Sequence, residues 1–151
     1  MPTAGQRLLA LDFTDSQLST DNTAQTGIGT AFATGTPTVD LTFTAPTSGK
    51  VLLTWSVKMG DSSATNILLA RPEVYLGADA TGSTVISGGD FFDLEMPIDS
   101  TSRPNATGSN QYIQTGLTAG STYYFRLLHR AASGGTANIS WRSIMAAPLP
   151  S

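Results

Sequence analysis

Apolar and polar residues alternate between Val39 and Met59, and this alternation constrains the fold more than any other feature of the chain. The apolar positions are Val39, Leu41 and Phe43 in a first run and Val51, Leu53, Trp55, Val57 and Met59 in a second. Because a strand turns successive side chains to opposite sides, each run fills a core with one face only. Pro46 and Gly49 lie between the runs and supply the fixed and the permissive φ that a chain reversal needs. We therefore expect a β-hairpin with one buried face.

Short runs of the same period, separated by turn residues, predict further strands along the chain. A short strand is expected at Leu9, Leu11 and Phe13, and a weak one over residues 28–34. Residues 64–76 are expected to be extended, because Pro72 would break a helix and belongs in a strand only at an edge or bulge. The remaining predicted strands are 84–87, 91–96, 111–115, 121–130 and 136–145, and the predicted loops include 14–27 and 97–109.

No window of helical period is present, so the sequence predicts an all-β protein. Roughly eight to ten short strands with regular turns are typical of an antiparallel jelly-roll sandwich. The predicted organisation is an N-terminal arm of residues 1–7, one β-sandwich domain over residues 8–147 and a C-terminal tail of residues 148–151.

The surface is expected to carry little charge. Hydrophobic residues make up 40% of the 151 residues but charged residues only 13%, with two lysines and two glutamates. Natural interfaces are depleted in lysine and glutamate, so this composition favours an assembly subunit. The alternative is an acidic monomer with a polar coat.

Charge and composition also exclude several function classes. The net charge of −3 opposes binding to a nucleic-acid backbone, so no nucleic-acid partner is expected. The absence of cysteine removes disulfides, thiolate metal sites and cysteine nucleophiles. No apolar run is long enough for a signal peptide or a membrane span, so we expect synthesis in a cytosol and no membrane partner.

No residue pattern amounts to a catalytic signature, and no enzyme activity or cofactor is expected. The only histidine, His129, shares its strand face with Tyr123, Phe125 and Leu127, which favours a structural role with a hydroxyl or carbonyl partner. Asp90, Asp93 and Glu95 form the one acidic cluster. A calcium site there, or a hydrolase using Asp93 or Glu95, is an alternative to a solvated edge, although no loop has the spacing of a ligand-bearing site.

One basic stripe is predicted on the last two strands. Arg126 and Arg130 share a face, and Arg142 lies on the corresponding side if the two strands form a hairpin. Tyr124 and Leu128 flank the stripe. Arginine next to an aromatic ring is typical of interface anchors, so the stripe is predicted either to contact a partner's carboxylates or to form salt bridges within one subunit.

The segment Val39–Val57, with Phe43-Thr44-Ala45-Pro46-Thr47-Ser48-Gly49-Lys50-Val51 at its centre, resembles the strand, turn and strand of tumour-necrosis-factor and C1q-like jelly rolls. The resemblance implies a homotrimer packed around a three-fold axis. Tyr124, Leu128 and Trp141 are the residues it places at the seam between subunits, with the arginine stripe as a candidate part of the interface.

The whole chain also resembles small structural proteins of actinobacterial tailed phages, which are described as minor tail or capsid-associated proteins. The resemblance is carried by Pro2-Thr3-Ala4-Gly5-Gln6-Arg7, Pro72-Glu73-Val74-Tyr75, Tyr123-Tyr124-Phe125-Arg126 with His129-Arg130, and Ile144-Met145-Ala146-Ala147-Pro148. It implies a non-enzymatic protein on the virion surface, made in the host cytoplasm.

Under this resemblance the expected function is that of a capsid decoration or cementing trimer. Its partners would be copies of itself and the major capsid protein or tail proteins. The arm, with Pro2, Thr3, Gln6 and Arg7, is then expected to bind the capsid. The alternative is a tail-tip or fibre-head domain that recognises glycan on the host surface.

Overall fold

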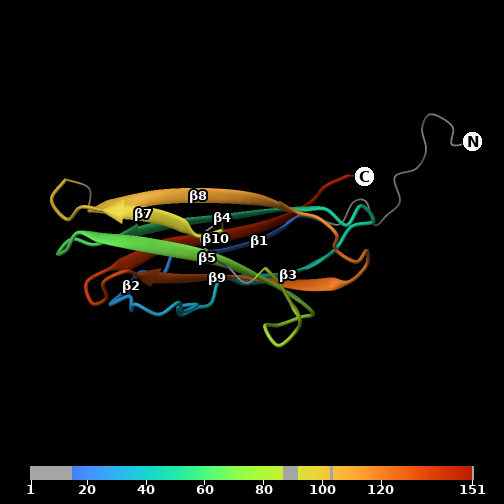
Figure 1. The fold of residues 1–151 in the computed structure, drawn as a ribbon, viewed down its shortest axis with the longest axis horizontal. Coiled ribbons are helices and arrows are strands. Elements are labelled where there is room, and N and C mark those ends of the chain that lie inside the picture. The colour runs from blue at the N-terminus through green and yellow to red at the C-terminus, as the bar shows by residue number, and fades with distance from the viewer. Residues whose placement is uncertain (1–14, 87–91, 103, 151) are drawn as a thin grey trace, which may run out of the picture.

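The computed structural model describes residues 15–86, 92–102 and 104–150 and contains two antiparallel five-stranded sheets packed face to face (Figure 1). Sheet A contains β1 (Gln17–Asp21), β2 (Gln25–Thr26), β4 (Val51–Gly60), β8 (Asn105–Gln114) and β10 (Asn138–Pro148). Sheet B contains β3 (Asp40–Thr44), β5 (Asn66–Leu76), β6 (Thr84–Ile86), β7 (Leu94–Ile98) and β9 (Thr122–Ala131). The prediction of an all-β antiparallel sandwich is confirmed. No helix in the described part of the chain is long and apolar enough to cross a membrane.

The chain changes sheet at most of its connections, which is the arrangement of a jelly roll. The strand order is β1-β10-β4-β8 in sheet A and β3-β9-β5-β6 in sheet B, with β2 paired to β10 and β7 paired to β5. β3 pairs with β9, and β4 pairs with β10 and β8. The predicted hairpin of residues 39–59 is therefore wrong, because its two strands lie in opposite sheets.

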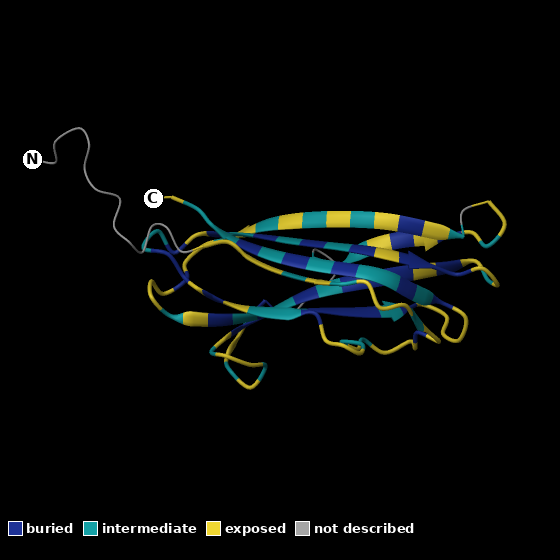
Figure 2. Cartoon of the chain, turned by 180° about the vertical axis from the view of Figure 1, so that it is seen from behind, coloured by how far each residue is buried: buried dark blue, intermediate teal, exposed yellow. Residues whose placement is uncertain are grey.

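The two runs nevertheless bury the faces that their alternation predicts. Val51, Leu53, Trp55, Val57 and Met59 are each no more than 1% exposed, and Figure 2 shows buried positions alternating with less buried ones along the strands. Alternation identifies the side of a strand that faces the core, but two strands can meet that condition from opposite sheets as well as from one. The segment between them is an arch across the core.

The arch depends on Gly49, as the turn residues suggested. Gly49 has φ of +62°, and a Cβ atom there would lie 2.6 Å from the carbonyl oxygen of Leu117. The Gly49 N–H donates to the Pro46 carbonyl (2.9 Å), and the Gly49 carbonyl accepts from the Leu117 N–H (3.1 Å). The arch thus packs backbone to backbone against the loop before β9, where only glycine fits.

A β-bulge reverses the predicted faces of β10. The register with β4 shifts between Ile139 and Trp141, so Ile139 points inward but Trp141 does not. Beyond the bulge the buried side chains are Arg142, Ile144 and Ala146, whereas Trp141 and Met145 are half-buried. Unbroken alternation through residues 136–145 would predict Trp141 and Met145 on the same face as Ile139. This prediction is wrong, because the extra residue of a bulge exchanges inside and outside for everything that follows.

The short strands were predicted less accurately than the long ones. β1 and β2 lie where residues 14–27 were expected to form a loop, because their exposed residues show no apolar alternation. Residues 28–34 form no strand and contribute only an isolated bridge between Ala33 and His129. β7 extends to Ile98 and β8 begins at Asn105, so both run into the predicted loop of residues 97–109. The predicted strand at residues 9–13 and the arm of residues 1–7 lie outside the described residues.

Pro72 lies within β5, at a position where its missing N–H costs no ladder hydrogen bond. The Leu76 N–H donates to Ser83 on the β6 side, so even-numbered residues of β5 direct their N–H groups away from β9. On that side β7 pairs with Asn66–Ala70, and β6 pairs with Val74 and Tyr75. The Pro72 nitrogen thus faces the gap between two short strands, which agrees with the expected edge position.

Replacing Arg142 tests the inward position of this side chain. Arg142 is fully buried, forms an ion pair with Asp21 and donates to the Thr34 carbonyl (2.9 Å). We expect Arg142→Met to lower the free energy of unfolding by about 3 kcal/mol, because the Asp21 carboxylate and the Thr34 carbonyl would lose their donor. Urea denaturation measures the loss. The double variant Arg142→Met with Asp21→Asn should recover part of it, and an unchanged midpoint for the single variant would contradict the inward placement.

Candidate interaction surfaces

The outer face of sheet A carries almost no charge. Strand register brings one side of β1, β10, β4 and β8 together on this face. Its residues are Leu18 and Thr20; Trp141, Ser143, Met145 and Ala147; Leu52, Thr54, Ser56 and Lys58; and Thr107, Ser109, Gln111 and Ile113. Lys58 is the sole ionisable side chain among them. We call this set the uncharged face.

The uncharged face has an apolar end and a hydroxyl-rich centre. Leu18 and Ile113 are 65% and 50% exposed, and they lie at the same end as Leu52 and Met145. Towards the middle, the Ser56 hydroxyl donates to the Ser109 hydroxyl (2.8 Å). Short hydroxyl side chains lose little rotamer entropy when a partner covers them, so this face is suited to burial.

The outer face of sheet B is built in the opposite way, from paired charges. The Arg126 guanidinium lies 2.6 Å from Glu73, and Tyr75 donates to the same carboxylate (2.7 Å). Burial, together with the Glu73 hydrogen bond, raises the pKa of Tyr75. The Tyr124 hydroxyl donates to Asp40 (2.6 Å).

The ion pair between Arg71 and Asp93 continues this network towards β7. Two nitrogens of Arg71 donate to the Asp93 carboxylate: Nε donates to Oδ1 (2.8 Å) and Nη2 donates to Oδ2 (2.7 Å). The Cζ atoms of Arg71 and Arg130 lie over the Phe32 ring, at 3.8 and 5.0 Å from its centroid. We call the surface of Asp40, Arg71, Glu73, Glu95, Arg126 and Arg130 the charged face.

The residues predicted for an interface separate in the structure. Tyr124, Leu128, Arg126 and Arg130 lie on the outer side of β9, within the charged face of sheet B, whereas Trp141 lies on the uncharged face of sheet A. Arg142 is fully buried, so its predicted place on an exposed stripe is wrong. The physical reason is the topology, since β9 and β10 lie in different sheets and the bulge turns Arg142 inward. The interface role of the other residues stays a prediction.

Most of the uncharged face could not be predicted from the sequence. Its hydroxyl positions on β4 and β8 alternate with buried or half-buried residues, a signal that marks an outer side but gives no register between strands. The proposed capsid-binding residues Pro2, Thr3, Gln6 and Arg7 lie outside the described residues, as does Asp90.

The acidic cluster is divided by pairing. Asp93 is held by Arg71, whereas Glu95 is exposed on β7. Among the described residues, no group of three or more histidine, aspartate or glutamate side chains is placed to hold a metal ion.

His129 lies under a loop at one end of the sandwich. Its side chain is 3% exposed, and its Nδ1 atom has no hydrogen-bond partner among the described residues. Burial, with a smaller contribution from the charge of Arg142, lowers the pKa of His129 to about 4. The imidazole is therefore neutral at pH 7.

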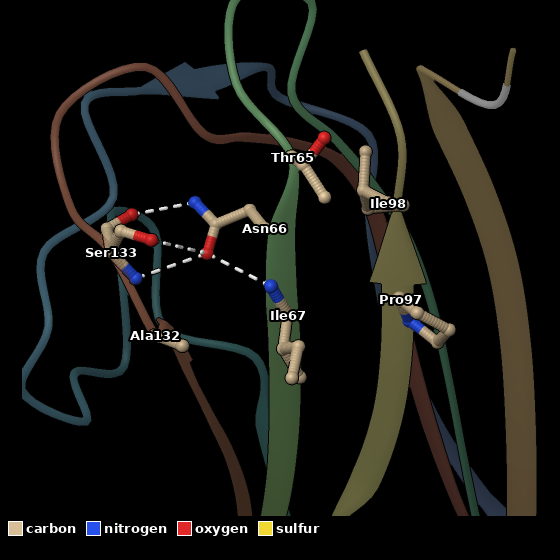
Figure 3. A pocket seen from close by; sticks show the side chains of 7 residues that line it. All are labelled: Thr65, Asn66, Ile67, Pro97, Ile98, Ala132 and Ser133. Carbon is tan, nitrogen blue, oxygen red and sulfur yellow. Dashed lines mark hydrogen bonds between the residues drawn. The ribbon is translucent and has the colours of Figure 1, made fainter. Parts of the chain in front are cut away.

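A hollow of about 350 Å³ lies beside the ends of β7 and β9. Figure 3 shows its lining, which is Thr65, Asn66, Ile67, Pro97, Ile98, Ala132 and Ser133. The Asn66 amide donates to the Ser133 carbonyl (2.6 Å) and accepts from the Ser133 N–H (3.0 Å), so the wall is fixed on both sides. The hollow contains hydroxyl groups and apolar surface but no charged side chain.

Buried Asp61 holds the loops behind the hollow. Its carboxylate accepts from the Ser63 and Ala64 N–H groups, from Asn66 and from the Thr136 hydroxyl, at 2.8 to 3.1 Å. Burial alone would raise the pKa of Asp61, but these hydrogen bonds outweigh it and lower the pKa. The β4–β5 and β9–β10 connections are thereby fastened to one carboxylate.

The sequence matches no protein-family model, and no curated protein matches it. Solved structures of β-sandwich domains show distant similarity. The Eiger TNF domain from S. frugiperda has 11% identity and a TM-score of 0.44, with 90% of this chain and 94% of that chain covered. The CBM22-1 xylan-binding domain of Paenibacillus barcinonensis Xyn10C has 10% identity and a TM-score of 0.38, with 87% and 86% covered. CBM35 of Cellvibrio japonicus Abf62 has 11% identity and a TM-score of 0.36, with 91% and 100% covered.

Replacing Asp61 tests the fastening of the loops. We expect Asp61→Ala to lower the free energy of unfolding by about 3 kcal/mol, because several buried donors lose their acceptor together. Thermal and urea denaturation measure the effect. Asp99→Ala is the matched control, since Asp99 accepts from two N–H groups in an exposed turn and its loss should matter far less. Equal effects of the two substitutions would show that Asp61 has no special role.

Proposed function

We propose that the chain is a non-enzymatic structural subunit that associates with copies of itself through the uncharged face. The observation that carries this proposal is the contrast between the two outer faces. One presents hydroxyl and apolar groups with Lys58 as its sole ionisable side chain, and the other presents a dense network of charges. Interface cores are depleted in charge, so the first face is the one to bury.

A second copy of the chain is the partner that suits this face best. Two copies with a net charge of −3 repel each other at long range, and a contact that carries few charges keeps this cost low. The apolar end around Leu18, Leu52 and Ile113 supplies area to bury, at about 25 cal/mol per Å². We propose a homotrimer, the state implied by the resemblance to tumour-necrosis-factor and C1q-like domains.

The proposed location is the surface of a virion, with the subunit as a capsid decoration or cementing protein. This part of the proposal rests on the resemblance to phage structural proteins. Its test is binding of the purified protein to capsids that lack it, and a failure to bind under conditions where the subunit is trimeric would refute the location without affecting the self-association.

Adding charge at the centre of the uncharged face tests the self-association. Light scattering of the unaltered protein should give a mass near three times 15.7 kDa. We expect Ser56→Lys to weaken association at least tenfold, because three ammonium groups would then be buried close together. Circular dichroism checks that the fold is retained.

Thr42→Lys is the matched control for Ser56→Lys. Thr42 is an exposed residue on the outer side of β3, in the other sheet, so its replacement should leave the mass unchanged. A monomeric wild-type protein at high concentration, or equal behaviour of the two lysine variants, would refute the proposed interface.

A second candidate function, recognition of host-surface glycan, is favoured by the hollow beside Asn66. Hydrogen bonds join Asn66 to Ser133 in its wall, and its lining is uncharged. Thr65 and Ser133 contribute hydroxyl groups, and Ile67 and Pro97 contribute apolar surface. Neutral sugars present the same combination of hydroxyl groups and apolar ring surface, which is the chemistry that such a lining could bind.

Filling the hollow tests glycan recognition. If a glycan array identifies a ligand, Ala132→Phe should lower its affinity at least tenfold, because the added ring occupies the space beside Ser133. Calorimetry measures the affinity. Ala78→Phe, at an exposed position in the β5–β6 turn, should bind normally. Retained affinity in Ala132→Phe would exclude the hollow as the site.

A further inference from the structure

Residues 28–38 cross the end of the sandwich over His129, and we call this segment the strap. Ala33 and His129 exchange both backbone hydrogen bonds, at 2.9 and 3.1 Å. Arg142 donates to the Thr34 carbonyl (2.9 Å), and the Gln25 amide donates to the Thr36 carbonyl. The start of the strap is fastened as well, because Ile28 and Gly29 share backbone hydrogen bonds of 3.0 to 3.3 Å with Ala131, Gly135 and Ala137. The middle of the strap, residues 33–36, is held at His129, Arg142 and Gln25.

The fit between the strap and His129 is close. Gly35 has φ of +77°, and a Cβ atom there would lie 2.8 Å from Cε1 of His129 and 2.6 Å from Oε1 of Gln25. The strap therefore packs directly against this side of the imidazole, which is 3% exposed. His129 is the sole histidine of the chain.

The charges around His129 do not accommodate a second cation. Arg142 of β10 faces the imidazole, and Asp21 of β1 lies behind it as the ion-pair partner of Arg142. Gln25 of β2 is neutral, and residues 28–38 of the strap contain no ionisable side chain. In the described part of the chain, the Asp21 carboxylate would thus have to balance the charges of both Arg142 and a protonated imidazole.

We propose that the strap is an acid-controlled lid, which opens when His129 takes up a proton and closes when the proton is lost. Opening gives the imidazolium access to water and separates it from Arg142. It also withdraws Phe32 from the guanidinium groups of Arg71 and Arg130, so the change at the end of the sandwich reaches the charged face.

The direction and the pH window follow from linkage. The closed form holds His129 with a pKa of about 4, and the open form restores the ordinary value near 6.5. Because the folded pKa is lowered, the closed state is fully stabilised above pH 6.5 and loses that stability as the pH falls towards 4. Between pH 7.5 and pH 5 the opening equilibrium should rise about 25-fold. Asp61, whose pKa is lowered from 3.8, loses its contribution only below this window.

Amide hydrogen exchange, corrected for the intrinsic effect of pH, tests the lid in the full chain. Protection of the Ala33 and His129 amides should fall about 25-fold between pH 7.5 and pH 5, while the amides of β4 keep theirs. In His129→Gln the strap amides should not respond to pH in this range. Constant protection in the unaltered chain, the same fall in His129→Gln, or an equal fall in β4 would overturn the proposal.

Two further measurements keep the test decisive if His129→Gln folds poorly. Gly35→Ala should open the strap at pH 7.5, because the added methyl group has no room and the backbone has a positive φ. Nuclear magnetic resonance of the unaltered chain follows the imidazole directly. If His129 titrates near pH 6.5 while Ala33 stays protected, protonation is compatible with a closed strap and the proposal fails.

Discussion

The core between the two sheets is the constraint on which the rest of the molecule depends. Each long strand gives one side to this core, and Trp55, Phe125, Leu127 and Ile144 fill it from opposite sheets. Because alternate residues of a strand cannot face the same way, the burial of one side leaves the other side available for a different purpose. The two outer faces are thus free to differ, and they do.

The two outer faces differ in the free energy that removing their water would cost. The outer side of sheet A can lose its water at low cost, since hydroxyl groups can pair with each other and few charges must be stripped of solvent. The outer side of sheet B holds its charges in pairs, such as Arg71 with Asp93 and Arg126 with Glu73. A polar network whose members are already paired is stable in water and gains less from a partner. The proposed self-association through sheet A rests on this asymmetry.

Polar groups inside the sandwich have a separate role, which is to fasten its connections. Asp61 joins two connections at one end, and the group formed by Asp21, Arg142 and His129 holds the strap. Both are buried, but they differ in how completely they are satisfied. Asp61 accepts hydrogen bonds at both oxygens, whereas Nδ1 of His129 and Nε of Arg142 find no partner in the part of the chain that the structure describes. A buried group without partners is the place where a change of protonation costs most.

The class of fold and the buried side of most long strands are predictable from the amino-acid pattern. Period-two alternation on β4 and β9 is a local property of the chain, and the structure confirms it at Val51–Met59 and at Tyr123–His129. Tertiary structure alone decided which strands pair. It placed β3 and β4 in opposite sheets, inserted the bulge after Ile139 that turns Arg142 inward, and brought four strands together as the uncharged face. The physical reason is that alternation records contact with a core but not the identity of the neighbour, because hydrogen bonds between strands are made by the backbone, which is the same at every residue.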